Sequence, residues 1–257
     1  MTGQAEGRAL QPRSLGDILN ETFIIYGRRF PRFLLLVGVV QGPLSLLALL
    51  PGGGIAGWVA AVAVTLFATA CVYGAVVWAV GQHYVKGEIS IASCYSRVGW
   101  RVMSLAVVSG ILAVSLAVDV LLMVFVVPAL ILSVYIFLCL GLTVSAVMME
   151  GQKPRGALDR IFKLLNGSWL RVLGIGTVVL LLTIGLALVL VAPFALASVG
   201  VGSTAGEILL TIAGVVVTVG VTPVAAISLT LIYYDLRVRK EDYDLVALSR
   251  EMGLVPA

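Results

Sequence analysis

The chain has 257 residues, of which 60% are apolar and only 12% are charged, and its formal net charge is +4. Soluble domains are about 45–50% apolar and about 25% charged, so this composition excludes a soluble enzyme, a disordered chain and a nucleic-acid-binding domain. The mean hydropathy of +1.11 instead indicates an integral membrane protein.

The N-terminal segment is polar and basic. It has no apolar core before a small-residue cleavage site, so we expect no signal peptide, and we expect residues 1–13 to be flexible. From Leu15 to Phe30 the apolar residues fall on one helical face, and Ser14 with Asp17 resembles a capping box. The pattern predicts an amphipathic helix that lies in the membrane interface.

Three long segments with almost no charge follow. Residues 33–85 have no charged side chain, and residues 102–149 and 172–234 have one acid each, Asp119 and Glu207. A transmembrane helix needs about 20 residues, so each segment fits two crossings and a turn. The fold class is therefore all-α, with six transmembrane helices arranged as three hairpins. The predicted crossings are 33–50, 57–83, 103–125, 128–149, 171–193 and 207–234.

Proline and glycine mark the expected turns and kinks. Pro51 to Gly54, Pro128, and Pro193 with the Gly/Ser stretch after it are turn signals in the three hairpins. Pro43 and Pro223 lie inside predicted crossings, where each indicates either a simple kink or a hinge beside a cavity.

The basic residues define the expected orientation. All 17 Lys and Arg residues lie outside the hairpin turns, in the N-terminal segment, in the loops between hairpins or after residue 234. Because cytoplasmic loops are rich in Lys and Arg, we expect a multi-pass protein of the cell (cytoplasmic) membrane with both termini in the cytoplasm. Residues 235–257 are the expected cytoplasmic tail, with one short amphipathic turn over Leu245 to Met252, ended by Gly253.

The single membrane domain, residues 1–257, resembles three copies of one unit. Phe23 and Arg32 match Phe162 and Arg171 at one constant offset, and the middle copy is shorter. Each unit would be a cytoplasmic interfacial amphipathic helix followed by a hairpin, although apolar sequences also match one another by chance. The interfacial helices would either surround the bundle or form a platform for lipid head groups or a partner. The predicted units are 14–84, 85–150 and 151–234.

Charged and polar residues provide the candidate sites. We expect no catalytic, cofactor or metal site, because no residues have the required spacing. Candidate intramembrane polar residues are Asp119, Gln41 and Thr222. Asp119 is expected near the outer boundary, as a boundary or hydrogen-bonding residue rather than an ion-coupling one.

The charged residues at the predicted inner boundary are candidate contacts for anionic lipid head groups or a partner. They are Arg32, Arg101, Arg171, Asp235, Arg237, Arg239 and Lys240. Alternatively, Asp235 and Arg237 pair with loop residues such as Glu150 or Arg171 and so lock the cytoplasmic face, or the cluster is a plain stop anchor.

Pro223 and the run from Tyr233 to Glu241, with Leu15 to Leu19 and Glu150-Gly151, carry a family resemblance. They resemble bacterial multi-pass proteins related to the membrane domain of glycerophosphoryl diester phosphodiesterases. The phosphodiesterase barrel of some relatives is absent, so the resemblance implies no hydrolase activity and brings no catalytic residue. Many stand-alone relatives have no assigned function.

The expected function is that of a non-enzymatic integral membrane protein. It would be an accessory or scaffold protein linked to membrane lipids or to a protein partner, with a second copy of the chain as another candidate partner and no role for nucleic acid. The alternative is a transporter or channel for small molecules or ions, with a path between the hairpins lined by residues such as Asp119, Gln41 or Thr222.

Overall fold

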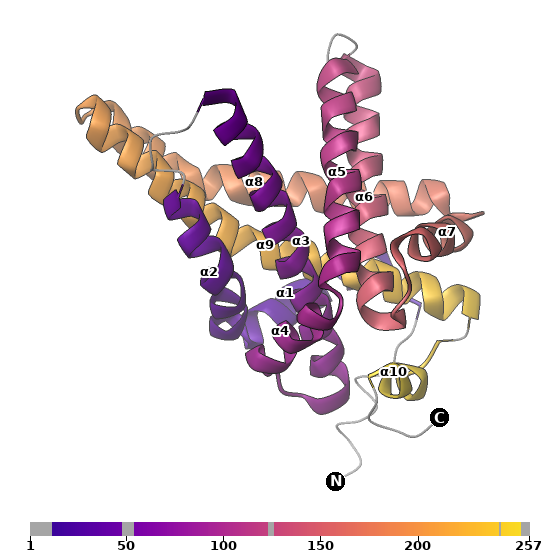
Figure 1. Cartoon of the computed structure of the whole chain (residues 1–257). Coiled ribbons are helices and arrows are strands. Elements are labelled where there is room, and N and C mark those ends of the chain that lie inside the picture. The colour runs from indigo at the N-terminus through magenta and orange to yellow at the C-terminus, as the bar shows by residue number, and fades with distance from the viewer. Residues whose placement is uncertain (1–11, 48–53, 123–125, 242, 253–257) are drawn as a thin grey trace.

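The computed structural model describes residues 12–47, 54–122, 126–241 and 243–252, and Figure 1 shows the whole chain. The described residues form α-helices and no strands. Predictions on residues 1–11, on Pro51 to Gly53 and on Gly253 lie outside the described residues. The helices, in chain order, are α1 (Leu15–Arg28), α2 (Phe30–Leu47), α3 (Gly54–Lys86), α4 (Ile91–Trp100), α5 (Val102–Leu122), α6 (Val126–Glu150), α7 (Pro154–Leu165), α8 (Trp169–Val199), α9 (Ser203–Glu241) and α10 (Leu245–Glu251).

The helices follow a repeating order of one short helix and two long ones: α1 to α3, α4 to α6 and α7 to α9. The short helix α10 follows the last set. The two long helices of each set lie side by side: α2 with α3, α5 with α6, and α8 with α9. Helix α9 is central, since it packs against α8, α2, α1, α3, α6 and α7. The derivation of these sets from one repeated unit remains a prediction.

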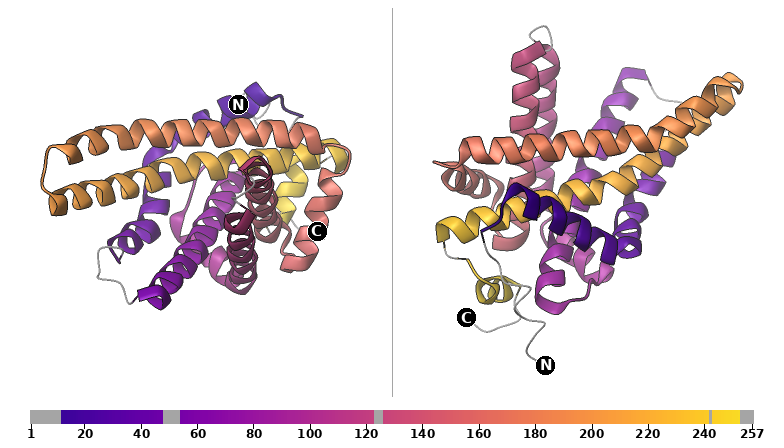
Figure 2. Two further views of the ribbon diagram at one scale, coloured as in Figure 1. Left: turned by 90° about the horizontal axis from the view of Figure 1, so that it is seen from above. Right: turned by 180° about the vertical axis from the view of Figure 1, so that it is seen from behind.

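The long helices diverge from a common base. In Figure 1 the short helices α1, α4 and α10 lie toward the lower part of the molecule, α7 lies at mid-height on the right, and the far ends of the long helices point away from them. The α8–α9 pair is steeply inclined to the α5–α6 pair in every view (Figure 2), so the molecule is not a bundle of parallel helices.

Sharp bends separate short helices from long ones. The bend between α4 and α5 is 77°, and that between α6 and α7 is 114°. Gly151, just after α6, has a φ of +75°, which glycine adopts without strain. A Cβ at Gly151 would also lie 2.5 Å from Nη2 of Arg101, whose flexible side chain would have to move, so the positive φ is the reason that this bend requires glycine.

Several helices are long and apolar enough to cross a membrane. In the described residues these are α8, the Val59–Lys86 part of α3 and the Thr204–Glu241 part of α9, or up to five spans if each bent pair counts as one. Large apolar side chains on α8 remain exposed, including Leu188 at 64% and Leu196 at 77%. Such surfaces suit lipid rather than water, as expected for a membrane protein.

The core lies where α1, α2, α3, α6 and α9 meet near the base. Its largest fully buried side chains include Ile18, Phe33, Leu142 and the pair Tyr233 and Tyr234. The predicted capping box at the start of α1 is confirmed, because Ser14 Oγ accepts from the Asp17 N–H and the Ser14 N–H donates to the Asp17 carboxylate.

Two predicted helix ends are wrong. The crossing expected to stop at Pro193 continues as α8 to Val199, because a proline inside a long apolar helix removes only one backbone hydrogen bond. The tail expected from residue 235 begins inside α9, which continues to Glu241. The ion pairs Asp235–Arg239 and Arg237–Glu241, each at i,i+4 spacing, support these last turns.

Candidate functional site: a charged base and a polar cavity

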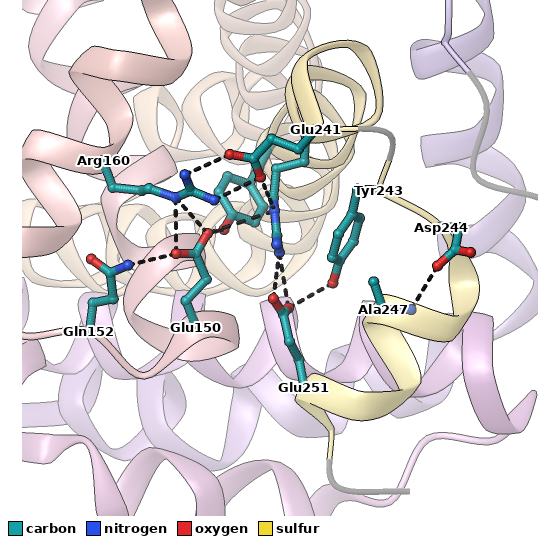
Figure 3. Close-up of polar contacts among 10 residues, drawn as sticks. Glu150, Gln152, Arg160, Glu241, Tyr243, Asp244, Ala247 and Glu251 are labelled. Carbon is teal, nitrogen blue, oxygen red and sulfur yellow. Dashed lines mark hydrogen bonds and ion pairs between the residues drawn. The ribbon is translucent and has the colours of Figure 1, made fainter. Parts of the chain in front are cut away.

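A first group of charged residues joins α6, α7, α9 and α10, and we call it the Glu150 cluster (Figure 3). Its members are Glu150, Arg160, Tyr233, Arg237, Glu241, Tyr243 and Glu251. Arg160 lies between two carboxylates, with Nε 3.1 Å from Glu150 Oε2 and Nη1 2.6 Å from Glu241 Oε1. These contacts fasten α7 to the ends of α6 and α9.

Arg237 is the centre of the Glu150 cluster, with 8% of its side chain exposed. Its Nε lies 3.7 Å from Glu150 and 3.2 Å from Glu241, and its Nη1 lies 2.9 Å from Glu251. The guanidinium also covers the ring of Tyr243, 3.6 Å from the ring centroid. A buried charge is costly unless it is paired and hydrogen-bonded, and these three carboxylates supply the pairing.

The tyrosines complete the hydrogen bonds of the cluster. Tyr243 donates its hydroxyl to Glu251 at 2.7 Å, and Tyr233 donates to Glu150. Burial raises the pKa of Tyr243, so its hydroxyl keeps its proton and remains a donor. The C-terminal helix α10 is thereby held against α9 through Arg237, Tyr243 and Glu251.

A second group, the Asp235 cluster, consists of Asp235, Arg171, Arg239 and the backbone of Arg13. The Asp235 side chain is 3% exposed and lies 3.0 Å from both Arg171 Nη1 and Arg239 Nε. It also accepts from the backbone N–H of Arg13 at 2.6 Å, and the carbonyl of Arg13 accepts from Arg171 at 2.6 Å. The backbone of Arg13 thus joins the chain just before α1 to α8 and α9; the predicted flexibility of residues 1–13 remains a prediction.

The structure brings the predicted charged residues to the base but not into one open patch. The expected pairing of Asp235 with Arg171 and of Arg237 with Glu150 is confirmed. Lys240 donates to the carbonyl of Asn166, and Arg32 to that of Ile89. Arg239 lies in the Asp235 cluster, and Arg101 packs over Gly151. Contact of any of these residues with lipid or a partner remains a prediction.

Sequence reasoning missed several members of the clusters. Arg160, Glu241 and Glu251 were not predicted, nor was the role of the Arg13 backbone. The i,i+4 spacing of Arg237 and Glu241 is a signal that was available. No local signal joins Arg13 to Asp235, because the contact depends on how α1 and α9 pack.

The predicted intramembrane polar residues divide between two places. Gln41 and Thr222 both line a cavity of about 480 Å³ between α2, α3 and α9, which we call the threonine cavity. Its lining consists of Gln41, Leu44, Thr65, Thr69, Thr211, Gly214, Val215, Thr218 and Thr222. Gln41 is 3% exposed and donates to Thr69 Oγ1 at 3.1 Å. Asp119 lies in α5, and its side chain is outside the described part of the chain.

Between the lining of the threonine cavity and the base, α2 and α9 carry apolar side chains that we call the packed layer. They are Phe33 and Leu36 of α2 and Val224 of α9, and all three are fully buried. Thr22 Oγ1 and Ser228 Oγ, also on the base side of the cavity lining, share a buried hydrogen bond of 3.2 Å.

In the described residues, no three His, Cys, Asp or Glu side chains lie close enough to hold a metal ion. Cys71, Cys94 and Cys139 are buried and form no disulfide.

Comparison with protein-family models, with curated proteins and with solved structures finds no match to this chain. The resemblance to the membrane domain of glycerophosphoryl diester phosphodiesterases therefore stays a prediction.

Proposed function

We propose that the protein is a non-enzymatic accessory or scaffold protein of the cell membrane, with its base at the cytoplasmic face. The long helices α2, α3, α5, α6, α8 and α9 would make six crossings in three hairpins, which requires the α8–α9 pair to take a steeper course in the bilayer than its inclination to α5–α6 gives it here. The base would offer a fixed surface to membrane lipids or to a protein partner. The placement of all 17 basic residues outside the hairpin turns supports this orientation.

The short helices support the membrane setting. Because α4 bends 77° from α5, α4 lies close to the membrane plane whenever α5 crosses it steeply. Helix α7 packs Ala157, Ile161 and Leu164 against the protein. It exposes Phe162 beside Asp159 and Lys163, and an exposed aromatic ring next to charged side chains suits the interface between acyl chains and head groups.

The packed layer below the threonine cavity is the observation that carries the scaffold proposal. A channel or carrier needs a path whose lining offers polar groups in succession. Here Phe33, Leu36 and Val224, which follow the cavity lining toward the base, are fully buried, and the ion pairs of the two clusters fasten the helices on the far side of that layer. A closed and internally fastened base suits a static protein better than one that alternates between two states.

Transport is the second candidate, and the threonine cavity favours it. Polar side chains inside a membrane are costly and often mark the path of a substrate or ion. Gln41 and the hydroxyls of Thr218 and Thr222 lie in stretches of α2 and α9 that are mostly apolar and carry no charge. A transporter would have to open the packed layer in order to pass a solute to the base.

A flux measurement separates the two candidates. The purified protein would be reconstituted in vesicles loaded with reporters for H⁺, Na⁺ and K⁺. The scaffold proposal expects wild type and the Gln41→Leu/Thr222→Val variant to match empty vesicles. Wild-type flux that the variant abolishes would establish transport and refute the scaffold proposal.

The orientation has its own test. Gly54→Cys and Lys240→Cys would be labelled separately with a membrane-impermeant maleimide. Position 54, at the start of α3, is expected to react only from outside, and position 240, at the base, only from inside. Labelling of both positions from the same side would contradict the proposed topology.

A further inference from the structure

A second basic feature of the base lies apart from the two charged clusters. It is a pocket of about 240 Å³ between the last turns of α3, helix α4 and the end of α10, which we call the Lys86–Arg97 pocket. Its lining residues are Trp78, Gln82, Lys86, Ser93, Ser96, Arg97, Trp100 and Met252. The lining includes no acid, unlike the Glu150 and Asp235 clusters.

In the described part of the chain, no acid pairs with the positive charges of this pocket. Neither Lys86 nor Arg97 forms an ion pair there, and the buried Nε of Arg97 has no hydrogen-bond partner among the described residues. Arg101 is a further positive neighbour, since burial and the adjacent Arg97 both lower the pKa of Arg101. A buried donor without a partner costs free energy, which an anionic ligand in the pocket would recover.

The walls of the pocket are fixed before any ligand enters. The guanidinium of Arg97 lies over the ring of Trp78, 4.6 Å from the ring centroid. Gln82 joins α3 to α4, because its Oε1 accepts from the Ser90 N–H at 2.9 Å and its amide nitrogen donates to Ser93. A pocket that needs little rearrangement binds its ligand more tightly.

The size and the position of the pocket limit the ligand. At about 240 Å³ the pocket is smaller than the roughly 300–1,000 Å³ of sites for drug-sized molecules, so it suits a compact group. Trp100, 87% exposed, stands at its edge on α4, and tryptophan side chains prefer the depth of lipid head groups. The proposed membrane setting puts the pocket at that depth.

We propose that the Lys86–Arg97 pocket binds the phosphate monoester head group of an anionic membrane lipid. A phosphate monoester carries about −1.5 to −2 charges near neutral pH, which matches one lysine and one arginine, whereas a phosphodiester carries a single charge. The planar guanidinium binds two phosphate oxygens at once, the ammonium of Lys86 faces the remaining charge, and the exposed Ser96 hydroxyl supplies a neutral donor.

The test is a lipid titration of the purified protein in neutral detergent, followed by native mass spectrometry. Wild type is expected to bind phosphatidic acid more tightly than phosphatidylglycerol with the same acyl chains. Lys86→Gln/Arg97→Gln is expected to weaken phosphatidic acid binding about 30-fold, the factor for two charges beside an anionic head group.

The matched control is Arg155→Gln/Lys163→Gln. It removes one arginine and one lysine from exposed positions on α7, and its lipid affinity is expected to equal that of wild type. An equal loss in both double variants, or no loss in either, would overturn the site. Equal affinity of wild type for the two lipids would overturn the choice of a monoester.

Competition by inorganic phosphate and the single variant Lys86→Gln complete the test. Inorganic phosphate is expected to compete weakly, and phosphate that binds as tightly as the lipid would overturn the assignment to a lipid. If Arg97→Gln does not fold, Lys86→Gln alone changes an exposed side chain and should cost about fivefold in affinity. The inference rests on the proposed membrane setting. Binding of lipid in detergent does not depend on the orientation of the protein, so the proposed pocket and the proposed topology can fail independently.

Discussion

Asp235→Asn is expected to destabilise the base by about 2 kcal/mol, although it changes only one atom of the side chain. The carboxylate is 3% exposed and is shared by Arg171 and Arg239. The asparagine oxygen can still accept from the Arg13 N–H, so the main effect is that two guanidinium groups lose their counter-charge.

The magnitude follows from the exposure of the partners. Removal of one member of a fully buried ion pair costs about 3–5 kcal/mol. The Arg171 and Arg239 side chains are 34% and 37% exposed, so they can partly turn to water, and we reduce the expected cost to about 2 kcal/mol. For a chain of this size, 1 kcal/mol shifts the melting temperature by about 2–4 °C, which predicts a fall of about 4–8 °C.

The assay is thermal melting in neutral detergent without anionic lipid, beside limited digestion with trypsin. Cleavage after Arg13 should become faster in Asp235→Asn, because the N-terminal segment loses part of its attachment. The control is Asp159→Asn, the same chemical change at an exposed position of α7 without an ion pair in the described residues, where about 0.5 kcal/mol or less is expected. If both variants melt at the same temperature, the Asp235 cluster does not stabilise the base.

Two further changes test local features of the fold. Ser14→Ala should cost about 1 kcal/mol as the loss of a helix cap. Hydrogen bonds from Ser14 lower the pKa of Asp17. The difference in melting temperature between Ser14→Ala and wild type should therefore persist near neutral pH and shrink as the pH falls through that lowered pKa. Gly176→Ala should destabilise by about 1–3 kcal/mol, because its new Cβ would collide with Leu138 of α6. Gly174→Ala, whose Cβ would meet nothing within 4 Å, should be neutral or stabilising in the same melts, and an equal loss in both glycine variants would show that α6 and α8 do not pack as described.

The sequence predicted the positions of the long helices well, because charge depletion marks them. The crossing predicted at 128–149 corresponds to α6 (Val126–Glu150), and the other predicted crossings likewise fall on long helices. The steep inclination of α8 and α9 was not predictable. It depends on close contacts such as Gly176 with Leu138 and Gly141 with Leu229, and glycines are too frequent in these helices to identify which of them make contacts.

The charged base was predictable only in part. Asp235 and Arg237 stood out because they follow a long apolar segment. Their partners Glu150 and Arg171 stand at the two ends of the charged loop between the second and third apolar segments. The attachment of α10 through Glu251 depends on a turn after α9 that brings the chain back. The Lys86–Arg97 pocket arises where α4 packs on α3, so its residues share no spacing by which the sequence could have indicated them.

The central place of α9 has a consequence for the order of assembly in the cell. Arg13 cannot form its hydrogen bond until Asp235, 222 residues further along the chain, has been synthesised. At a synthesis rate of about 5–20 residues per second, that interval lasts about 10–45 s, during which α1, α2, α3 and α6 lack the helix they share. Until α9 emerges, the nascent protein thus exposes the faces of these helices that α9 later covers to the bilayer or to insertion factors, and a chain cut short before residue 203 cannot form its core.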